Sequence, residues 1–320
     1  MEIISNSSQV DIKKAAQALK DGHLVAFPTE TVYGLGADTT NENAVSRIYS
    51  VKGRPTDHPL IVHISSLNQL NKWASDIPNY ALKLARKFWP GPMTLILKRS
   101  ELAKNFITGG QNNVGLRVPD QPVALALLSE FEILGGVGIA APSANRFGAV
   151  SPTTSMATFD EIGSYLISED LILDGGVCRI GVESTIIDCT GESPVILRPG
   201  AITLEMIEEL INLKVNSLLL DNRIRVSGNL STHYSPKAEV LLDLLPEPND
   251  GFFAMSEIQT PVGSIRLGSP KNIEEFARDI YSALRLADVK KIKRIAVITP
   301  SGPGLAVAIR DRLAKSSRIR

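Results

Sequence analysis

Two cations, Lys52 and Arg54, flank a glycine at the predicted end of a helix, and Pro55 then turns the chain away. A guanidinium offers a bidentate fork and an ammonium a point charge, so together they suit a phosphate group. The same pair could instead only complement the helix dipole. Because Gly-Arg-Pro forces an abrupt exit that aims the guanidinium away from the helix, we favour phosphate binding.

Two further arginines stand in or at the end of apolar strands. Arg117 lies within the predicted strand 114–118, and Arg198 directly follows the strand 195–197, before Pro-Gly. A buried charge without a partner is costly. Arg117 therefore needs an anion, either a carboxylate of the protein or that of a substrate.

Small polar side chains gather in loops that follow apolar strands. The loop 28–36 carries hydroxyls, a carboxylate and two glycines, and a later loop carries Ser143 and Asn145. A spacing of two places Ser143 and Asn145 on one side of an extended backbone. The polar groups of the second loop would then face the same space. The loop 28–36 could instead be a turn that caps itself.

Several familiar signatures are absent. The sequence has no G-x-x-x-x-G-K-[ST], no G-x-S-x-G and no H-E-x-x-H, and its four histidines have no metal-ligand spacing. The run 136–141 matches G-x-G-x-x-A, but Pro142 follows at once, so no helix can open there. A phosphate would have to be bound by side chains.

The charge balance of the 320-residue chain is neutral, with 34 basic and 34 acidic side chains. Neutrality argues against a general polyanion binder. The balance is an average, however: residues 1–205 have a net charge of −4, residues 206–320 of +4, and residues 285–320 alone of +8. The basic end reads as a solvated helix face, and contact with tRNA or a partner protein is the alternative.

The number of cysteines and the length of the apolar runs exclude several classes of protein. Two cysteines exclude a disulfide framework and a zinc-finger set. No run reaches the roughly 18 apolar residues of a membrane span, and the N-terminus lacks a signal-peptide pattern. We therefore expect no membrane partner and a cytoplasmic protein.

The elements that must position these residues alternate between strands and helices, which predicts α/β architecture. We expect a mixed α/β sheet over 1–205, a connecting helix and linker over 206–237, and a small α/β domain over 238–320. The predicted strands are 24–27, 60–64, 93–97, 114–118, 138–141, 171–173, 184–189, 195–197, 238–244, 262–267 and 294–299. The predicted helices are 10–21, 44–51, 66–74, 79–88, 121–130, 203–213, 272–289 and 305–315.

Seven short motifs occur in one order: P-T-E-T-V-Y-G-L, K-G-R-P, W-P-G-P-x-T, G-x-R-x-P, A-P-S-A-N, E-S-T-I-x-D and L-R-P-G. With them, the chain resembles the YrdC-like family of threonylcarbamoyl-AMP synthases, in the long form with an additional C-terminal domain. The H-Y-S-P at 233–236 resembles the linker of that form. The resemblance implies a twisted mixed sheet with a deep, positively charged cavity, and a smaller Rossmann-like C-terminal domain.

The activity that the resemblance implies is nucleotidyl transfer. L-threonine, bicarbonate or carbon dioxide, and ATP would give threonylcarbamoyl-adenylate and pyrophosphate, with Mg²⁺ carried by ATP and no metal ligand from the protein. The product would serve the first step of threonylcarbamoyladenosine formation in tRNA. A separate tRNA threonylcarbamoyl transferase would act next, so any tRNA contact would be indirect.

The resemblance also assigns residues. Its catalytic tetrad falls on Lys52, Arg54, Ser143 and Asn145. Further expected ATP contacts are His58, Asn113, Ser151, Arg198 and Tyr234. The expected threonine contacts are Thr31 (or Thr29), His63, Arg117, Ala141 and Ser184. Two positions depart from the family pattern: His58 replaces a common asparagine, and Thr232 stands where an arginine often precedes His-Tyr.

Other functions remain open at this stage. A non-catalytic RNA-binding module of the same fold would bind tRNA in a salt-dependent way without ATP turnover. The intact tetrad and the 5% content of aromatic residues argue against it. A carbamoyltransferase of the hydrogenase-maturation kind would need zinc-finger cysteines that the chain lacks. A nucleotide-binding regulator is the third alternative.

Overall fold

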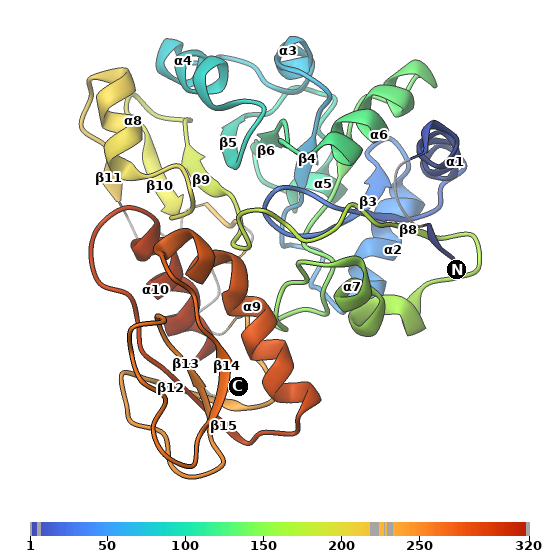
Figure 1. The fold of residues 1–320 in the computed structure, drawn as a ribbon. Helices are drawn as coiled ribbons and strands as arrows, with labels where there is room; N and C mark the ends of the chain where they lie inside the picture. Colours follow the sequence, from blue (N-terminus) through green and yellow to red (C-terminus); the bar gives the residue numbers. More distant parts are fainter. Residues whose placement is uncertain (1, 5–7, 218–223, 227, 229–232, 318–320) are drawn as a thin grey trace.

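The computed structural model describes residues 2–4, 8–217, 224–226, 228 and 233–317, which form two sheets with helices around them (Figure 1). The larger sheet has 11 strands and the smaller has 4. Among the described residues, no helix has the length and apolar character needed to cross a membrane.

The large sheet is mixed, as the sequence predicts. Its strand order is β1-β8-β2-β3-β7-β4-β6-β5-β9-β10-β11, with both parallel and antiparallel neighbours. The expected fold class is thereby confirmed. The strands are β1 (Glu2–Ile4), β2 (Val25–Phe27), β3 (Gly34–Asp38), β4 (Ile61–His63), β5 (Met93–Lys98), β6 (Asn113–Arg117), β7 (Ile139–Ala140), β8 (Leu171–Leu173), β9 (Thr185–Asp188), β10 (Val195–Arg198) and β11 (Asn216–Ser217).

Strand direction gathers the polar strand ends. β5 runs antiparallel to β6 and parallel to β9, and β10 runs antiparallel to β9. One edge of the sheet therefore holds the end of β6 with Arg117, the start of β5 with Thr94, and the end of β10 with Arg198. His63 ends β4 and lies directly across from Arg117 in the parallel β4–β6 register.

Helices cover the large sheet on both faces, and side-chain caps fix the start of several of them. α2 begins after Asn41, whose side chain accepts from the amide of Ala44. It ends at Gly53, whose positive φ of 62° lets the chain leave sharply toward Arg54. The helices are α1 (Gln9–Lys20), α2 (Glu42–Lys52), α3 (Leu70–Trp73), α4 (Asn79–Phe88), α5 (Asn105–Thr108), α6 (Pro122–Ile133), α7 (Ser155–Ile162) and α8 (Leu204–Ile211), with 3₁₀ turns at Leu67–Gln69 and Gly163–Tyr165.

The small sheet belongs to the C-terminal domain and is parallel throughout. Its order is β12-β15-β13-β14. Figure 1 shows the two helices of this domain on the side of the small sheet that faces the large sheet. The elements are β12 (Glu239–Leu242), β13 (Gly251–Phe253), β14 (Ile265–Gly268), α9 (Ile273–Val289), β15 (Arg294–Val297) and α10 (Leu305–Ser316).

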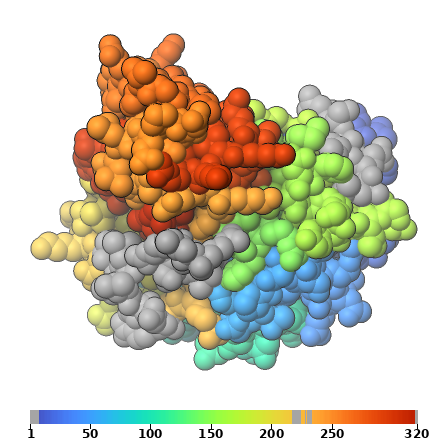
Figure 2. Space-filling view, turned by 90° about the horizontal axis from the view of Figure 1, so that it is seen from below, coloured from blue at the N-terminus to red at the C-terminus, as the bar shows by residue number. Residues whose placement is uncertain are grey.

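The two domains share a hydrophobic core. One apolar cluster contains Val32, Val150 and Val182 of the large domain together with residues of α9, α10 and the small sheet. The backbones also meet, because a Cβ at Gly181 would overlap the main chain of α9 at Arg278. Figure 2 shows the orange and red atoms of the C-terminal domain lying directly on green atoms of the large domain.

Some elements differ from those expected. β3 begins at Gly34, inside the predicted loop 28–36, because cross-strand pairing with β2 and β7 holds a glycine-rich segment extended. The helix that we expected to connect the domains, α8, packs on α4, and β11 pairs with β10 of the large sheet. β1, α5, α7, β11 and β13 were not predicted, since each is short and carries little periodicity.

Candidate functional site

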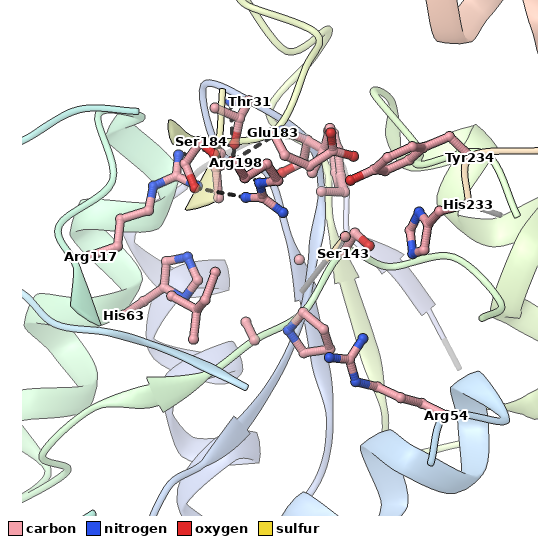
Figure 3. A pocket seen from close by; sticks show the side chains of 18 residues that line it. Thr31, Arg54, His63, Arg117, Ser143, Glu183, Ser184, Arg198, His233 and Tyr234 are labelled. Carbon is pink, nitrogen blue, oxygen red and sulfur yellow. Dashed lines mark hydrogen bonds between the residues drawn. The ribbon is translucent and has the colours of Figure 1, made fainter. Parts of the chain in front are cut away.

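A cavity of about 50 Å³ lies between the strand ends and loops of the large domain and the linker (Figure 3). Its volume suffices for roughly three to five water molecules. The lining comes from strand ends, from the loops after β2 and β7, and from the linker. The lining residues are Thr29, Thr31, Val32, Tyr33, Gly34, Arg54, Ile61, His63, Arg117, Ala141, Pro142, Ser143, Glu183, Ser184, Arg198, Gly228, His233 and Tyr234.

Three arginines line this cavity, and all three are buried. Arg54, Arg117 and Arg198 are 7%, 4% and 4% exposed. Burial lowers the pKa of Arg54 to about 10 and lowers that of Arg198 as well. A guanidinium still keeps its charge at neutral pH, so the cavity concentrates positive charge in a poorly solvated space. Such a space favours an anion.

Arg117 already has an anion within the protein. Its Nη2 lies 2.7 Å from Oε1 of Glu30, which is also buried. The same nitrogen donates to the hydroxyl of Thr31 at 3.0 Å. Of the two anions that the sequence left open, the structure therefore provides the internal carboxylate. The rest of the guanidinium faces the cavity, beside His63 (Figure 3).

The threonines of the loop after β2 stabilise its turn. Thr29 Oγ1 donates to the carbonyl of Val32 at 2.6 Å and accepts from the amides of Thr31 and Val32 at 3.2 Å. The two threonine hydroxyls are 2.8 Å apart. The self-capping turn and the cavity wall are thus the same structure, so the two interpretations of this loop do not compete.

Ser184 and Arg198, which also line the cavity, hold each other. Arg198 donates through Nε to the carbonyl of Ser184 at 3.0 Å and through Nη2 to its hydroxyl at 3.1 Å. That hydroxyl is also 2.8 Å from the hydroxyl of Thr94, across the β5–β9 pair. Arg198 is therefore fixed before any ligand arrives.

Two members of the expected tetrad lie beneath the cavity wall. Lys52 is buried, and its Nζ donates to the carbonyls of Ser143, at 2.5 Å, and of Asn145. The side-chain amide of Asn145 donates to the carbonyls of Arg146 and Ala149, at 2.7 and 2.8 Å. Burial, with the charge of Arg54 adding, lowers the pKa of Lys52 well below its usual value. Both side chains hold the loop that presents Ser143.

The remaining expected ATP contacts are distributed around the cavity. Ser151 lies behind it and donates to Glu183 at 2.7 Å. His58 is outside the lining and packs edge-on against Phe147, with ring centroids 5.4 Å apart. Asn113 lines a different, small cavity beside Arg225. Thr232 lies outside the described residues, so its departure from the family pattern has no structural counterpart here.

The described part of the linker covers the cavity; we call Gly228, His233 and Tyr234 the linker cap. Both ring residues are buried, with centroids 4.0 Å apart. Tyr234 has a positive φ of 61°, and its hydroxyl has no hydrogen-bond partner among the described residues. A buried hydroxyl without a partner costs free energy, so it marks a place for a polar group of a ligand.

Sequence reasoning missed several lining residues. Glu183 and His233 stand in segments that the sequence singled out, yet neither was assigned a role. The signal for Glu183 was present, because a carboxylate followed directly by an apolar strand must find a cation if it is buried. Thr29 was named only as the alternative to Thr31. Tyr33 and Gly34 carried no signal of their own.

Both cavity histidines are held neutral. Burial and then the charge of Arg117 lower the pKa of His63 to about 3. Burial also lowers the pKa of His233 to about 3; Glu183 opposes that shift, while Lys52 and Arg54 reinforce it. Between pH 5 and 8, neither imidazole therefore carries a positive charge or acts as an acid toward a ligand.

This neutrality predicts an acid-sensitive fold. Between pH 3 and 6.5 the unfolded histidine binds a proton that the folded one does not, so stability falls as pH decreases below 6.5. At pH 5.5 each histidine should lower the free energy of unfolding by about 1.4 kcal/mol relative to neutral pH. Urea unfolding at pH 7.5 and 5.5 should show a smaller loss for His63→Gln than for the wild type. His23→Gln, outside the cavity, is the control, and an equal loss in all three proteins would contradict the prediction.

Comparisons with known proteins agree across the whole length. A family profile described as "Telomere recombination" matches residues 17–200, and one described as "Threonylcarbamoyl-AMP synthase, C-terminal domain" matches residues 202–317. A threonylcarbamoyl-AMP synthase of Pyrococcus abyssi is 40% identical over 328 residues, with 97% of this chain and 94% of the relative covered. One from Bacillus subtilis is 38% identical, with 99% and 95% covered.

A solved structure resembles the fold equally closely. The crystal structure of P. abyssi Sua5 complexed with L-threonine superimposes with a TM-score of 0.89 at 38% identity. The match covers 99% of this chain and 98% of that one, so it includes both sheets and the segment between them.

Proposed function

Because the chain belongs to the threonylcarbamoyl-AMP synthase family in its two-domain form, we propose that its arginine-lined cavity joins L-threonine, bicarbonate or carbon dioxide, and ATP. The chain is an ATP-using, adenylyl-transferring enzyme that makes threonylcarbamoyl-AMP. The observation that carries the assignment is the convergence of three buried arginines on one cavity. A cavity of this kind suits a reaction in which every substrate is anionic or becomes so.

The reaction has a demanding bond-forming step. The threonine amine adds to carbon dioxide and releases a proton, which leaves a carbamate. A carbamate oxygen then bonds to the α-phosphorus of ATP, and the bond to the bridging oxygen breaks as pyrophosphate leaves with the electron pair. Two anions must approach, so fixed positive charge and positioning provide the catalysis. No covalent bond to the protein is required.

We assign the threonine end to the side of the cavity where β4 and β6 end. Arg117 would receive the threonine carboxylate, with Thr31 and Ser184 as further donors. His63, held neutral, would donate or accept one hydrogen bond. Backbone near Ala141 would form the wall. The cross-strand pairing of His63 with Arg117 supports this grouping, since it fixes both side chains on rigid elements.

We assign the triphosphate to the opposite side. Arg54 and Arg198 would contact phosphate oxygens directly, with Ser143 as a hydrogen-bond partner. Lys52 and Asn145 would act from beneath, by holding the Ser143 loop. Ser151, Asn113 and His58 remain candidate nucleotide contacts.

The linker cap must move for ATP to enter. A cavity with room for a few waters does not admit a nucleoside triphosphate, and the buried ring of Tyr234 is part of its lining. The described geometry is therefore the covered form. Displacement of Tyr234 would admit ATP, and its return would exclude water from the adenylate.

Mg²⁺ would arrive with the triphosphate and neutralise part of its charge. Within the described residues, no group of three or more His, Cys, Asp or Glu side chains is placed to hold a metal ion. Mg²⁺ commonly keeps several waters and binds phosphate oxygens of a nucleotide. The protein's part is then to hold the phosphates.

We further propose the wider setting. Residues 1–205 would form the catalytic domain, the segment up to 237 the connection, and 238–320 the C-terminal domain, with α8 and β11 packed on the catalytic sheet. The product would pass in the cytoplasm to a separate tRNA threonylcarbamoyl transferase.

The assignment is tested by incubation with ATP, Mg²⁺, bicarbonate and radiolabelled threonine. Pyrophosphate and a labelled threonylcarbamoyl-adenylate should form in equal amounts, and omission of bicarbonate should stop both. Serine in place of threonine measures side-chain selectivity. Release of ADP and phosphate, or no pyrophosphate at all, would refute the assignment.

The linker cap gives a separate prediction for Tyr234→Phe. The ring and its stacking remain, and the unpartnered hydroxyl is lost. If that hydroxyl bonds a phosphate, the KM for ATP should rise by about 10-fold or more, while stability stays equal or increases by about 1 kcal/mol. Tyr80→Phe is the matched control, because its hydroxyl donates to the carbonyl of Gly191 at 2.8 Å on a distant surface. An unchanged KM for ATP would leave Tyr234 as a purely steric cover.

A further inference from the structure

The carboxylate of Glu183 lines the cavity but is held mainly from the C-terminal domain. Its Oε2 accepts from Nε of Arg312 at 2.8 Å and from the hydroxyl of Tyr281 at 2.9 Å. Its Oε1 accepts from Ser151 at 2.7 Å and from the same tyrosine hydroxyl at 3.2 Å. Two of the three side chains that orient this carboxylate therefore lie about 100 residues or more further along the chain.

Arg312 contacts two segments on which the position of Arg198 depends. One contains Glu183 and Ser184, and the other contains Pro199, which follows Arg198 in the chain. While Nε engages Glu183, Nη2 donates to the carbonyl of Pro199 at 2.9 Å. Ser184, which follows Glu183, is the residue that holds Arg198 through its carbonyl and hydroxyl. Arg312 is fully buried, so its guanidinium has exchanged water for these contacts. The position of Arg198 is thereby tied to α10.

The same two side chains contact the linker cap. The ring of Tyr281 stacks on Tyr234, with centroids 5.7 Å apart, and the guanidinium of Arg312 lies 5.4 Å from the centre of the Tyr234 ring. One turn along α10, Lys315 donates through Nζ to the carbonyl of Gly228 at 2.9 Å. α9 and α10 thus fix one cavity wall and the cap together.

The charge arrangement supports a positioning role. Burial raises the pKa of the Glu183 carboxyl, but Arg312 and Arg198 outweigh it and lower the pKa to about 2. An ionised carboxylate in this place accepts hydrogen bonds only, so it orients the hydroxyls of Ser151 and Tyr281 toward itself. Arg312, for its part, is engaged by Glu183 and Asp311 and is covered by Tyr234. It does not line the cavity.

We propose that Arg312 and Tyr281 are positioning residues for the adenylation step, which act by holding Glu183, Pro199 and the Tyr234 ring. The C-terminal domain then completes the active site through two side chains, without touching a substrate. The proposal rests on the proposed function, since adenylation is the step that it serves.

The test compares Arg312→Met, Glu183→Gln and the double variant in pyrophosphate release. For Arg312→Met, kcat should fall by about 100-fold, the effect of a misplaced site, while the KM for threonine stays within about threefold. Arg117 and Thr31 are on other elements, so threonine binding should persist. Because Arg312→Met already breaks the Arg312–Glu183 contact, adding Glu183→Gln should lower kcat no further. Tyr281→Phe, which keeps the ring stack, should lower kcat by about fivefold to tenfold.

Arg310→Met is the matched control on the same helix. Arg310 donates to the carbonyls of Pro300 and Gly302, within the C-terminal domain and away from the cavity. Its loss should leave kcat unchanged. A folded Arg312→Met with the kcat of Arg310→Met would overturn the proposal, as would losses that multiply in the double variant. If Arg312→Met does not fold, Tyr281→Phe becomes the test of the proposal. A wild-type kcat in the Tyr281→Phe enzyme would then contradict it. A wild type that releases no pyrophosphate would instead refute the proposed function.

Discussion

Replacement of Lys52 by methionine should lower pyrophosphate release by about 100- to 1,000-fold while the protein stays folded. Methionine fills a similar volume but cannot donate to the carbonyls of Ser143 and Asn145, which Lys52 Nζ now joins. The Ser143 loop then loses its anchor, and the cavity loses one nearby positive charge. The measurement is kcat for pyrophosphate release at saturating ATP and threonine.

Lys20→Met is the matched control for this variant. Lys20 and Lys52 are each the last residue of their helix, α1 and α2, so both substitutions remove the same interaction with a helix C-terminus. Lys20 is exposed and distant from the cavity. Two unpaired carbonyls should also destabilise Lys52→Met by about 1–3 kcal/mol, which urea unfolding will show. Near-normal kcat in folded Lys52→Met would remove Lys52 from the catalytic assignment.

The second large effect is expected at Arg117. Substitution by methionine should weaken threonine binding by about 10- to 150-fold, the range for a hydrogen bond to a charged group, and change ATP binding by less than about threefold. Calorimetric titration with each ligand separates the two. The reverse order of effects would reassign Arg117 to the nucleotide.

Glu30 complicates the single variant and also supplies its control. Arg117→Met leaves a buried carboxylate without its cation, which should cost about 3–5 kcal/mol of stability. Adding Glu30→Gln removes that charge and should restore much of the stability. If threonine binding stays weak in the stabilised double variant, the loss belongs to the guanidinium. Recovery of threonine binding together with stability would make the role of Arg117 structural.

The long helices could be predicted because local signals agree. α9 shows apolar residues at helical spacing and begins after Asn272, whose side chain accepts from the amide of Glu275. β3 shows the opposite case, since Gly-Leu-Gly-Ala-Asp has low strand propensity and only its neighbours β2 and β7 hold it extended. Tertiary pairing decides such a segment, and a single sequence does not contain that information.

The residues of the site also fall into those that the sequence could predict and those that it could not. Arg117 and Arg198 could be singled out because a cation in an apolar strand has few explanations, and both line the cavity. Whether Lys52 faces the cavity or the underside of the Ser143 loop depends on how two distant loops stack, which spacing does not reveal. Arg312 contacts Glu183 across 129 positions of sequence, so no local pattern pointed to it.

The shared core has a consequence for dividing the protein. Val32, Val150 and Val182 are buried, and they pack in one apolar cluster with residues of the C-terminal domain. A chain shortened to end after β11 would expose these three valines to water as an apolar surface that favours aggregation. Anyone building a minimal catalytic fragment should therefore replace Val150 and Val182 by polar side chains before judging its activity, and keep Val32 because it lines the cavity.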